Sequence, residues 1–361
     1  MIHLYPYTDL YDISPLLQLK IAKYRLVFTT ALPVKARGLS ALLRSRLGYI
    51  LKGRFCPFQD YGAVHCSRCS SSPCCFYPVL FDPTNQHMET ANIGQGKPQK
   101  TPPRPFTIDI LGASLNSVLE PGNHYAVELT LLGARAVSFQ RPMLESITHA
   151  LASIQTSRLQ VVFDPGGIEN PLTPLLWQGL VPENAEDNLE LVLTDEFGIA
   201  NSDMAKTLLS WIRAMPALVL DRDASDVAMM TIELRTPFQL ERDKRNLTFT
   251  GFMQSVVSRL RDLKRNYHPD NGMGSFSKEF YAAGDRVQVF TDIETARHTW
   301  YSYRQKRNVD IGGMQGSLIF KGDLEPFIPL IAAGFLIGVG KKVAYGLGRF
   351  GMQQYDLWPP Q

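Results

Sequence analysis

The sequence lacks the long apolar segments that membrane insertion requires. Its longest uncharged run, Pro326 to Gly340, contains two prolines and is shorter than the ~20 apolar residues that span a bilayer. The first residues carry Asp9 and Asp12 and have no continuous apolar core, so they do not resemble a signal peptide. We therefore expect a cytoplasmic protein without a membrane partner.

The sequence also lacks a nucleotide-binding motif, although residues 338–350 contain four glycines. A Walker loop requires Gly, four residues, Gly-Lys and then Ser or Thr. Here Gly334 is one residue too far from Gly340, and Lys342 takes the hydroxyl position. A dinucleotide fingerprint would need a glycine where Val343 stands. These absences exclude the common nucleoside-triphosphate and dinucleotide sites.

The glycine-rich segment 338–350 instead combines its glycines with Lys341, Lys342 and Arg349, and it contains no acid. Glycine allows positive φ and a close approach of the backbone to a ligand. Exposed N–H groups in such loops bind anions. The segment therefore predicts a loop that binds the phosphodiester chain of a nucleic acid.

Acidic residues are also missing from residues 13–59, which hold nine lysines and arginines, whereas residues 181–196 are acid-rich. This separation of charge is typical of proteins that bind polyanions. Within the basic stretch, leucines recur at helical spacing over residues 39–51. We expect an amphipathic helix whose cations face phosphates; the alternative is an ordinary solvated helix face.

Cysteine is scarce, and all five cysteines lie between Cys56 and Cys75. Cys66-x-x-Cys69 is one half of a zinc-type knuckle, and Cys56 with Cys74 or Cys75 would complete four thiolate ligands. No second C-x-x-C pair exists, and a cytosolic protein rarely forms disulfides. A structural zinc site and a set of free thiols therefore remain equal alternatives.

The order of apolar patterns repeats once along the chain. Both halves follow β-α-β-β-α-β, which predicts an α+β protein of tandem ferredoxin-like (RRM-like) domains. The first half carries a Cys-rich insertion at about residues 55–105. We expect an N-terminal domain at 1–164, a connecting subdomain at 165–228 and a C-terminal domain at 229–361. The expected strands are 23–32, 106–111, 125–132, 159–163, 230–234, 287–290, 316–320 and the stretch from 343 onward; the expected helices are 39–51, 143–154, 205–214, 249–267 and 324–337.

Residues 297–307 mix arginines, lysine and histidine with Trp300, Tyr301 and Tyr303, again without an acid. Single-stranded RNA is bound by this mixture, because cations contact phosphates and flat rings stack on bases. The alternative is an ordinary strand with a basic exposed face. Its position close to the glycine-rich segment favours RNA binding.

Several motifs of the second half occur together, and with them the chain resembles a known family. They are Arg304-Gln305-Lys306-Arg307, Gly312-Gly313, Gly316, Gly322-Asp323-Leu324 with Pro326-Phe327, and Gly340-Lys341 followed by Tyr345-Gly346-Leu347-Gly348-Arg349. The sequence resembles the CRISPR-associated endoribonucleases that process precursor CRISPR RNA, members of the RAMP superfamily. The cysteine cluster, followed by Leu80-Phe81-Asp82-Pro83 and Arg104-Pro105-Phe106, is similar to a cysteine-bearing branch of that family.

The resemblance implies tandem ferredoxin-like domains and metal-independent cleavage of repeat RNA. The 2′-OH upstream of the scissile phosphate attacks, which leaves a 2′,3′-cyclic phosphate and a 5′-OH, and the enzyme can stay bound to its product. No cofactor is needed for this chemistry. The protein supplies a general base and a cation for the pentacoordinate phosphate. The implied partners are repeat or precursor CRISPR RNA and other Cas effector subunits.

The site residues follow from these patterns. Many relatives carry a histidine in or beside the first helix, but residues 39–54 contain none, so His298 and His268 are the candidates for the general base. The expected RNA-binding residues are Arg37, Arg44, Arg46, Lys52, Arg304, Lys306, Arg307, Gly340, Lys341, Lys342, Tyr345, Gly346, Gly348 and Arg349; the expected metal ligands are Cys56, Cys66, Cys69 and Cys74.

Two other functions compete with the endoribonuclease. The first is a catalytically inactive RAMP-type subunit that binds guide RNA in a CRISPR effector complex. The second is a zinc-dependent interaction module whose basic surfaces are incidental. Cleavage of repeat RNA in EDTA distinguishes the endoribonuclease from the inactive subunit. A steep salt dependence of RNA binding distinguishes both from the interaction module.

Overall fold

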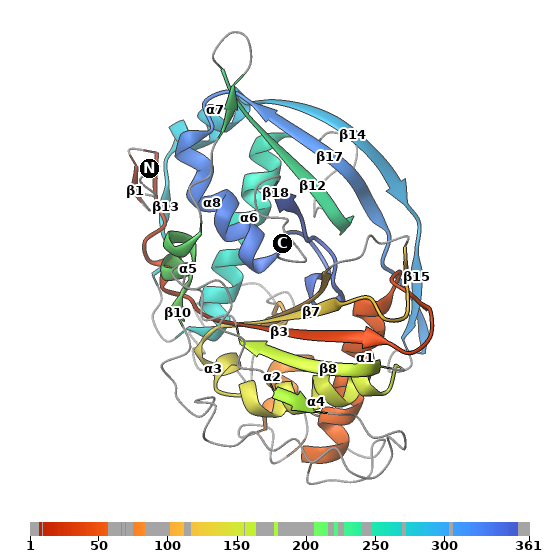
Figure 1. Cartoon of the computed structure of the whole chain (residues 1–361). Helices are drawn as coiled ribbons and strands as arrows, with labels where there is room; N and C mark the ends of the chain where they lie inside the picture. The colour runs from red at the N-terminus through yellow and green to blue at the C-terminus, as the bar shows by residue number, and fades with distance from the viewer. Residues whose placement is uncertain are drawn as a thin grey trace.

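The computed structural model describes residues 7–8, 10–56, 66, 69, 75–83, 102–111, 117–154, 156–163, 177–179, 206–215, 220–222, 227–239, 247–268, 272–302 and 306–352. Over these residues the chain forms two α+β units, each with its own antiparallel sheet (Figure 1). None of the helices in the described ranges combines the length and the apolar character needed to cross a bilayer.

The first unit has the strand order of a ferredoxin-like fold. It runs β3 (Lys20–Thr30), α1 (Leu39–Phe55), β5 (Phe106–Leu111), β7 (Tyr125–Leu132), α4 (Gln140–Ala152) and β8 (Thr156–Phe163). The sheet order is β5-β7-β3-β8, all antiparallel, with β9 (Trp177–Gly179) beside β8. The short elements here are β4 (Val34–Lys35), α2 (Phe76–Phe81), β6 (Val118–Leu119), α3 (Ala134–Val137) and β10 (Lys206–Thr207).

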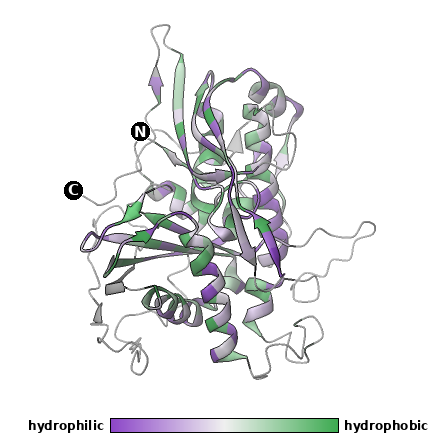
Figure 2. Cartoon of the chain, turned by 90° about the vertical axis from the view of Figure 1, so that its right-hand side faces the viewer, coloured by the Kyte–Doolittle hydropathy of each residue, from purple (hydrophilic) through white to green (hydrophobic). Residues whose placement is uncertain are grey.

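The sequence of α1 explains why it packs on this sheet. Leu39, Leu43, Leu47 and Leu51 are spaced four residues apart, so they lie on one face of the helix. All four are buried in the same core as the inward-facing side chains of β3 and α4. Green and purple bands alternate along the helices in Figure 2, as expected for elements with one buried and one exposed face.

The second unit repeats this order. It runs β12 (Ala228–Phe238), α6 (Phe249–Tyr267), β14 (Gln288–Ala296), β17 (Gly313–Lys321), α8 (Ile328–Ile337) and β18 (Gly351–Met352). The antiparallel sheet order is β14-β17-β12-β18. The additional elements are β1 (Tyr7–Thr8), β2 (Tyr11–Asp12), α5 (Leu208–Ala214), β11 (Asp221–Arg222), β13 (Ser275–Phe276), α7 (Lys278–Asp285), β15 (Thr299–Ser302) and β16 (Arg307–Asp310).

The predicted α+β class and the β-α-β-β-α-β order of both halves are confirmed by these two sheets. Most of the expected Cys-rich insertion lies outside the described residues, and α2 within it was not expected. The boundaries of the three expected domains stay predictions.

Two strand predictions were wrong. Residues 297–307 were expected to form one strand, but β15 and β16 pair with each other as a separate hairpin. The long strand expected from Val343 onward is a 3-10 turn, Val343–Tyr345, followed by the two-residue β18, and residues 353–361 lie outside the described part. Gly346 and Gly348 have φ of 83° and 69°, and left-handed backbone of this kind cannot continue a strand.

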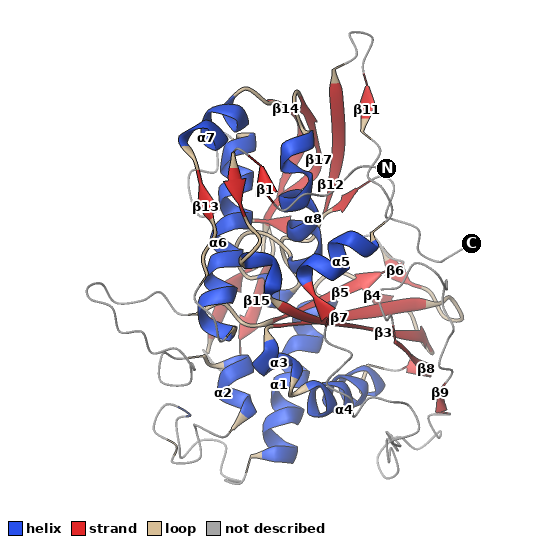
Figure 3. Ribbon diagram, turned by 90° about the vertical axis from the view of Figure 1, so that its left-hand side faces the viewer, coloured by secondary structure: helices blue, strands red, loops and turns tan. Residues whose placement is uncertain are grey.

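The two units meet across one face of the first sheet. Figures 1 and 3 show α1, α2 and α4 on one side of β3 and β8, and α5, α6 and α8 of the described chain on the other side. The face of β5 and β7 that is turned toward the second unit carries the acids Asp109 and Glu128, which are 2% and 5% exposed. Buried carboxylates require partners.

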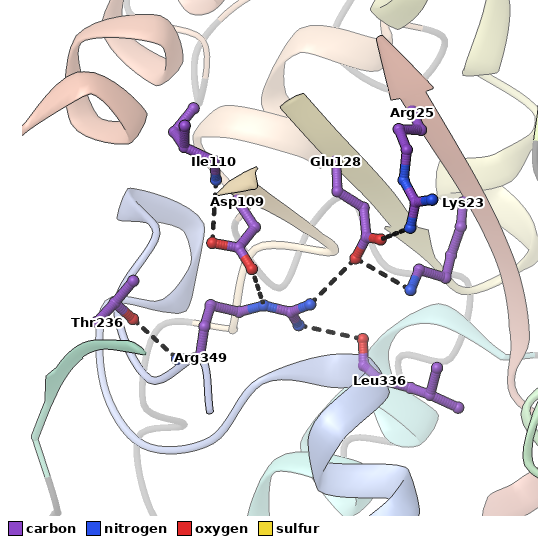
Figure 4. A network of polar contacts seen from close by, with 8 residues as sticks. All are labelled: Lys23, Arg25, Asp109, Ile110, Glu128, Thr236, Leu336 and Arg349. Atoms are coloured by element: carbon purple, nitrogen blue, oxygen red, sulfur yellow. Dashed lines mark hydrogen bonds and ion pairs between the residues drawn. The ribbon is translucent and has the colours of Figure 1, made fainter. Parts of the chain in front are cut away.

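Arg349 supplies these partners from the second unit (Figure 4). Its guanidinium lies 3.2 Å from Asp109 Oδ2 through Nε and 3.2 Å from Glu128 Oε1 through Nη2. Nη1 donates to the carbonyl oxygen of Leu336 at 3.3 Å. The backbone N–H of Arg349 donates to Thr236 Oγ1 at 2.9 Å. Arg349 therefore links β5 and β7 of the first unit to β12 and α8 of the second.

Glu128 is the centre of this network. Lys23 Nζ lies 3.0 Å from Glu128 Oε1, and Arg25 Nη2 lies 3.4 Å from Glu128 Oε2. Burial alone would raise the pKa of Glu128, but Lys23, Arg349 and Arg25 outweigh it and lower the pKa to about 2. Glu128 is therefore ionised throughout the neutral range and stabilises the contact between the units.

The glycine-rich segment fills the space beside Arg349. A Cβ atom at Gly346 would overlap Ser40 of α1 and lie 3.0 Å from the carbonyl oxygen of Ile108. A Cβ atom at Gly348 would overlap the carbonyl oxygen of Val339. The glycines are thus required by the close packing of the second unit against α1 and β5.

We expect Arg349→Met to lower the free energy of unfolding by about 3–5 kcal/mol, because it leaves Asp109 buried without its partner and weakens the environment of Glu128. Chemical denaturation measures the loss. The matched control is Arg141→Met on α4, which removes an exposed ion pair with Glu145 and should change stability by less than ~1 kcal/mol.

The effect of Arg349→Met also depends on pH. Because the pKa of Glu128 is lowered in the folded state, its contribution is present above its ordinary value of 4.5 and is lost as the pH falls toward about 2. The difference between wild type and Arg349→Met should therefore shrink over that range. A difference that stays constant from neutral pH to pH 3 would contradict the role given to Glu128.

We expect Gly346→Ala to destabilise the protein more than Gly122→Ala does. Both residues have nearly the same positive φ, 83° and 82°, so the backbone strain of about 1 kcal/mol is shared. A Cβ at Gly122 meets nothing within 4 Å, whereas one at Gly346 collides with α1. Thermal unfolding of the two variants measures the difference, and equal melting temperatures would contradict the close packing.

Candidate functional site

The β15–β16 hairpin of the second unit lies against the start of α1 in the first unit. Arg37 Nη2 donates to the carbonyl oxygen of Arg297 at 2.8 Å. A Cβ atom at Gly38 would lie 3.3 Å from Nε2 of His298 and 3.7 Å from the ring of Trp300. We call this place, formed by Arg37, Gly38 and His298, the hairpin corner.

Apolar packing holds the hairpin corner together. Ile311, Tyr345 and Leu347 form a small buried cluster with Ala41 of α1, and Trp300 packs against it. The backbone N–H of Ile311 donates to the carbonyl oxygen of His298 at 2.7 Å. The position of His298 relative to α1 is therefore fixed by contacts on both sides of it.

His298 has the properties of a general base. Its Nε2 atom is buried and has no hydrogen-bond partner among the described residues. Burial of the ring, and then the positive charge of Arg37, lower the pKa of His298 below its ordinary value of 6.5. The imidazole is therefore neutral at physiological pH, with a ring nitrogen that can accept a proton.

Three predicted cations lie at or near the hairpin corner. Arg37 is exposed at the corner itself, and Lys306 and Arg307 are exposed at the turn and on β16 of the hairpin. Lys342 Nζ donates to the carbonyl oxygen of Asp310 on β16, which brings a fourth cation to the hairpin. The exposed Lys341 and half-buried Gly340 precede and follow along the same segment, and Arg304 lies outside the described residues.

His268, the second candidate base, lies elsewhere. It follows the last residue of α6, and its Nδ1 atom lies 2.9 Å from Nζ of the fully buried Lys264. The preceding Tyr267 packs against Gly133, before α3, and donates to the carbonyl oxygen of Pro103. The structure does not bring His268 and His298 together, so the two cannot act on one phosphate.

Five of the predicted RNA-binding residues are buried, which corrects their assignment: Arg44, Tyr345, Gly346, Gly348 and Arg349. Arg44 lies over the ring of Tyr345, with its guanidinium carbon 3.9 Å from the ring centre. Arg349 is occupied by Asp109 and Glu128 as described above. These side chains join the units rather than face a ligand, because a cation in a glycine-rich segment can serve buried acids as well as phosphates.

The two remaining predicted cations lie along α1, away from its buried face. Arg46 Nη1 donates to the carbonyl oxygen of Ser153 at 2.6 Å, and Lys52 Nζ lies 5.7 Å from the ring centre of Tyr77. Both side chains are half-buried. Each therefore keeps part of its surface available beyond these contacts.

The cysteines give an incomplete site. Cys56, Cys66 and Cys69 are free and half-buried, as is Cys75, while Cys74 lies outside the described residues. In the described part of the chain, no three His, Cys, Asp or Glu side chains are grouped so as to hold a metal ion. The predicted metal site therefore stays a prediction.

Sequence reasoning missed the acids that bind Arg349. Asp109 and Glu128 are single charged residues inside the apolar strands β5 and β7. A lone acid in an otherwise buried strand signals a buried cationic partner, and Arg349 was available for that role. The meeting of Gly38 with His298 has no such signal, because 260 residues separate them along the chain.

Comparisons with known proteins give one informative family. The model described as CRISPR-associated endoribonuclease Cas6 matches residues 232–350, and the AF_1859_N model, described as an N-terminal domain, matches residues 18–165. The chain has no significant match among curated proteins.

Solved structures give distant likenesses. The chain is similar to Thermus thermophilus Cas6 (TTHB231) at 14% identity over 92% of this chain and 98% of that chain, with a TM-score of 0.44. It is similar to a Cas6 (TTHA0078) product complex at 15% identity over 92% and 99%, with a TM-score of 0.42. The family assignment depends on the match of residues 232–350.

Proposed function

Residues 232–350 belong to the CRISPR-associated endoribonuclease Cas6 family, and we propose that this chain binds repeat RNA and cuts precursor CRISPR RNA at the hairpin corner. The observation that carries this proposal is the buried, unpartnered Nε2 atom of His298 within the described structure, beside the start of α1. Relatives were expected to carry a histidine at the first helix, and here the second unit supplies one to that place.

The reaction needs no group outside the protein and the RNA. His298 Nε2 accepts the proton of the 2′-OH, the 2′-oxygen forms a bond to the scissile phosphorus, and the bond from phosphorus to the 5′-oxygen breaks. The leaving 5′-oxygen takes up a proton. The products are a 2′,3′-cyclic phosphate and a 5′-OH.

Arg37 is suited to stabilise the transition state. Its guanidinium is held beside His298 by the bond to the carbonyl oxygen of Arg297, and its remaining N–H groups can contact the two negative oxygens of the pentacoordinate phosphate. Arg37 also lowers the pKa of His298, which keeps the base deprotonated. Lys341, Lys342, Lys306 and Arg307 would bind the flanking phosphates.

The protein has two further proposed partners. Other Cas effector subunits would bind the chain if it stays on its product. A zinc ion would be bound by Cys56, Cys66, Cys69 and one of the adjacent Cys74 and Cys75. The backbone N–H of Cys69 donates to the carbonyl oxygen of Cys66 at 3.3 Å, a turn that fits the C-x-x-C half of a zinc site.

We expect His298→Ala to slow cleavage of a labelled repeat RNA by about 10²- to 10⁴-fold under single-turnover conditions in EDTA, because the general base is lost. RNA affinity should change little. The wild-type rate should fall as the pH drops through the lowered pKa of His298, since protonation removes the base.

The control for His298→Ala is His268→Gln, which lies away from the hairpin corner and should cut within about twofold of wild type. Wild-type rates in His298→Ala would contradict the proposal. Tight binding by the wild type with no cyclic-phosphate product would instead support the inactive guide-RNA subunit.

We expect about one zinc per chain in protein purified from zinc-containing medium, and its loss in Cys66→Ser, because four thiolates are the usual structural ligand set. Metal analysis with thiol titration measures both. Comparison of Cys74→Ser with Cys75→Ser identifies the fourth ligand. Metal-free wild type with five titratable thiols would contradict the zinc proposal.

A further inference from the structure

Tyr49, on the outward face of α1, is 68% exposed, more than any other large hydrophobic side chain in the described part of the chain. The side chains of the opposite helix face are buried in the core of the first unit. An exposed aromatic ring on a helix that already has a complete buried face does not contribute to the core. Its exposure points to a ligand that stacks on it.

The surroundings of Tyr49 on α1 are cationic. Arg46 lies one turn before Tyr49, and Lys52 and Arg54 lie within the turn after it, while α1 contains no acid. Gly53, four residues after Tyr49, is exposed and has no side chain, so the next turn of the helix leaves the ring uncovered. A flat ring between cations is the arrangement that holds single-stranded nucleic acid.

The position of Tyr49 connects it to the hairpin corner. α1 begins beside His298 at Gly38, and Tyr49 comes eleven residues later, which is about 16 Å along a helix axis. A strand with a stacked rise of about 3.4 Å per nucleotide covers that length in about five nucleotides. In Figure 1, α1 runs from the region of β15 away toward the edge of the molecule.

We propose that single-stranded RNA leaving the hairpin corner runs along α1 and that Tyr49 stacks on one of its bases, with Arg46 and Arg54 contacting its phosphates. This inference rests on the proposed RNA cleavage at His298. A protein partner is the less suitable occupant, because the exposed residues next to Tyr49 are cations and a glycine rather than an apolar patch.

The test measures binding of RNAs that carry a 2′-deoxy nucleotide at the cleavage position, so that they are not cut. One flank, then the other, is shortened nucleotide by nucleotide. Wild type should lose affinity in a step when one flank falls below about five nucleotides. Tyr49→Ala should bind the long RNA about tenfold more weakly and the shortened RNA like wild type, whereas Tyr49→Phe should match wild type throughout.

The matched control is Phe290→Ala, which removes another exposed aromatic ring, 52% exposed on β14, and should leave both affinities unchanged. Equal binding of long RNA by Tyr49→Ala and wild type overturns the inference, as does a loss that is the same for long and shortened RNA. Cleavage of uncut 2′-OH RNA is followed in parallel. If wild type cuts while Tyr49→Ala binds normally, only this inference fails; if wild type neither binds nor cuts, the proposed function fails with it.

Discussion

The structure depends on a buried ion-pair network between Arg349 of the second unit and Asp109 and Glu128 of the first. Three cations in all contact Glu128, which lowers its pKa to about 2 despite its burial. Such a network contributes less to net stability than its Coulomb attraction suggests, but the loss of one partner is strongly unfavourable. It therefore specifies one relative arrangement of the two ferredoxin-like units.

This arrangement determines where chemistry is possible. With Arg349 bound to β5 and β7, the glycine-rich segment packs against α1, and the cluster of Ile311, Tyr345 and Leu347 packs on Ala41. The hairpin then meets the start of α1, and His298 of one unit lies beside Arg37 and Gly38 of the other. The proposed active site is thus composed of residues from both units, and neither unit contains it alone.

The sequence predicted the repeating elements well and the tail of the chain poorly. β5, β7 and α6 have the predicted bounds, because their apolar residues alternate or recur at helical spacing and end at clear signals, such as the Thr248 cap of α6. The strand expected after Val343 failed, since the positive φ of Gly346 and Gly348 interrupts it. Composition alone does not show whether a glycine turns toward a ligand or toward a neighbouring helix.

The predicted site was right in character but less so in detail. A basic, aromatic stretch with His298 does lie beside α1, yet Tyr345 and Arg349 are part of the domain contact. A pattern read along the chain gives the residue types of a surface. It does not give long-range pairing, such as that of Arg349 with acids more than 200 residues away. The role of Arg349 required knowing that β5 and β7 bury their acids against the second unit.

The account's central claim is that the scissile phosphate binds where the two units meet. Photocrosslinking with a photoreactive nucleotide next to the cleavage position, followed by mass spectrometry of the peptides, tests this most directly. The account predicts crosslinks to two separate parts of the chain, the start of α1 around Arg37 and the β15 region around His298. Crosslinks confined to one unit, or to the end of α6 around His268, would contradict it.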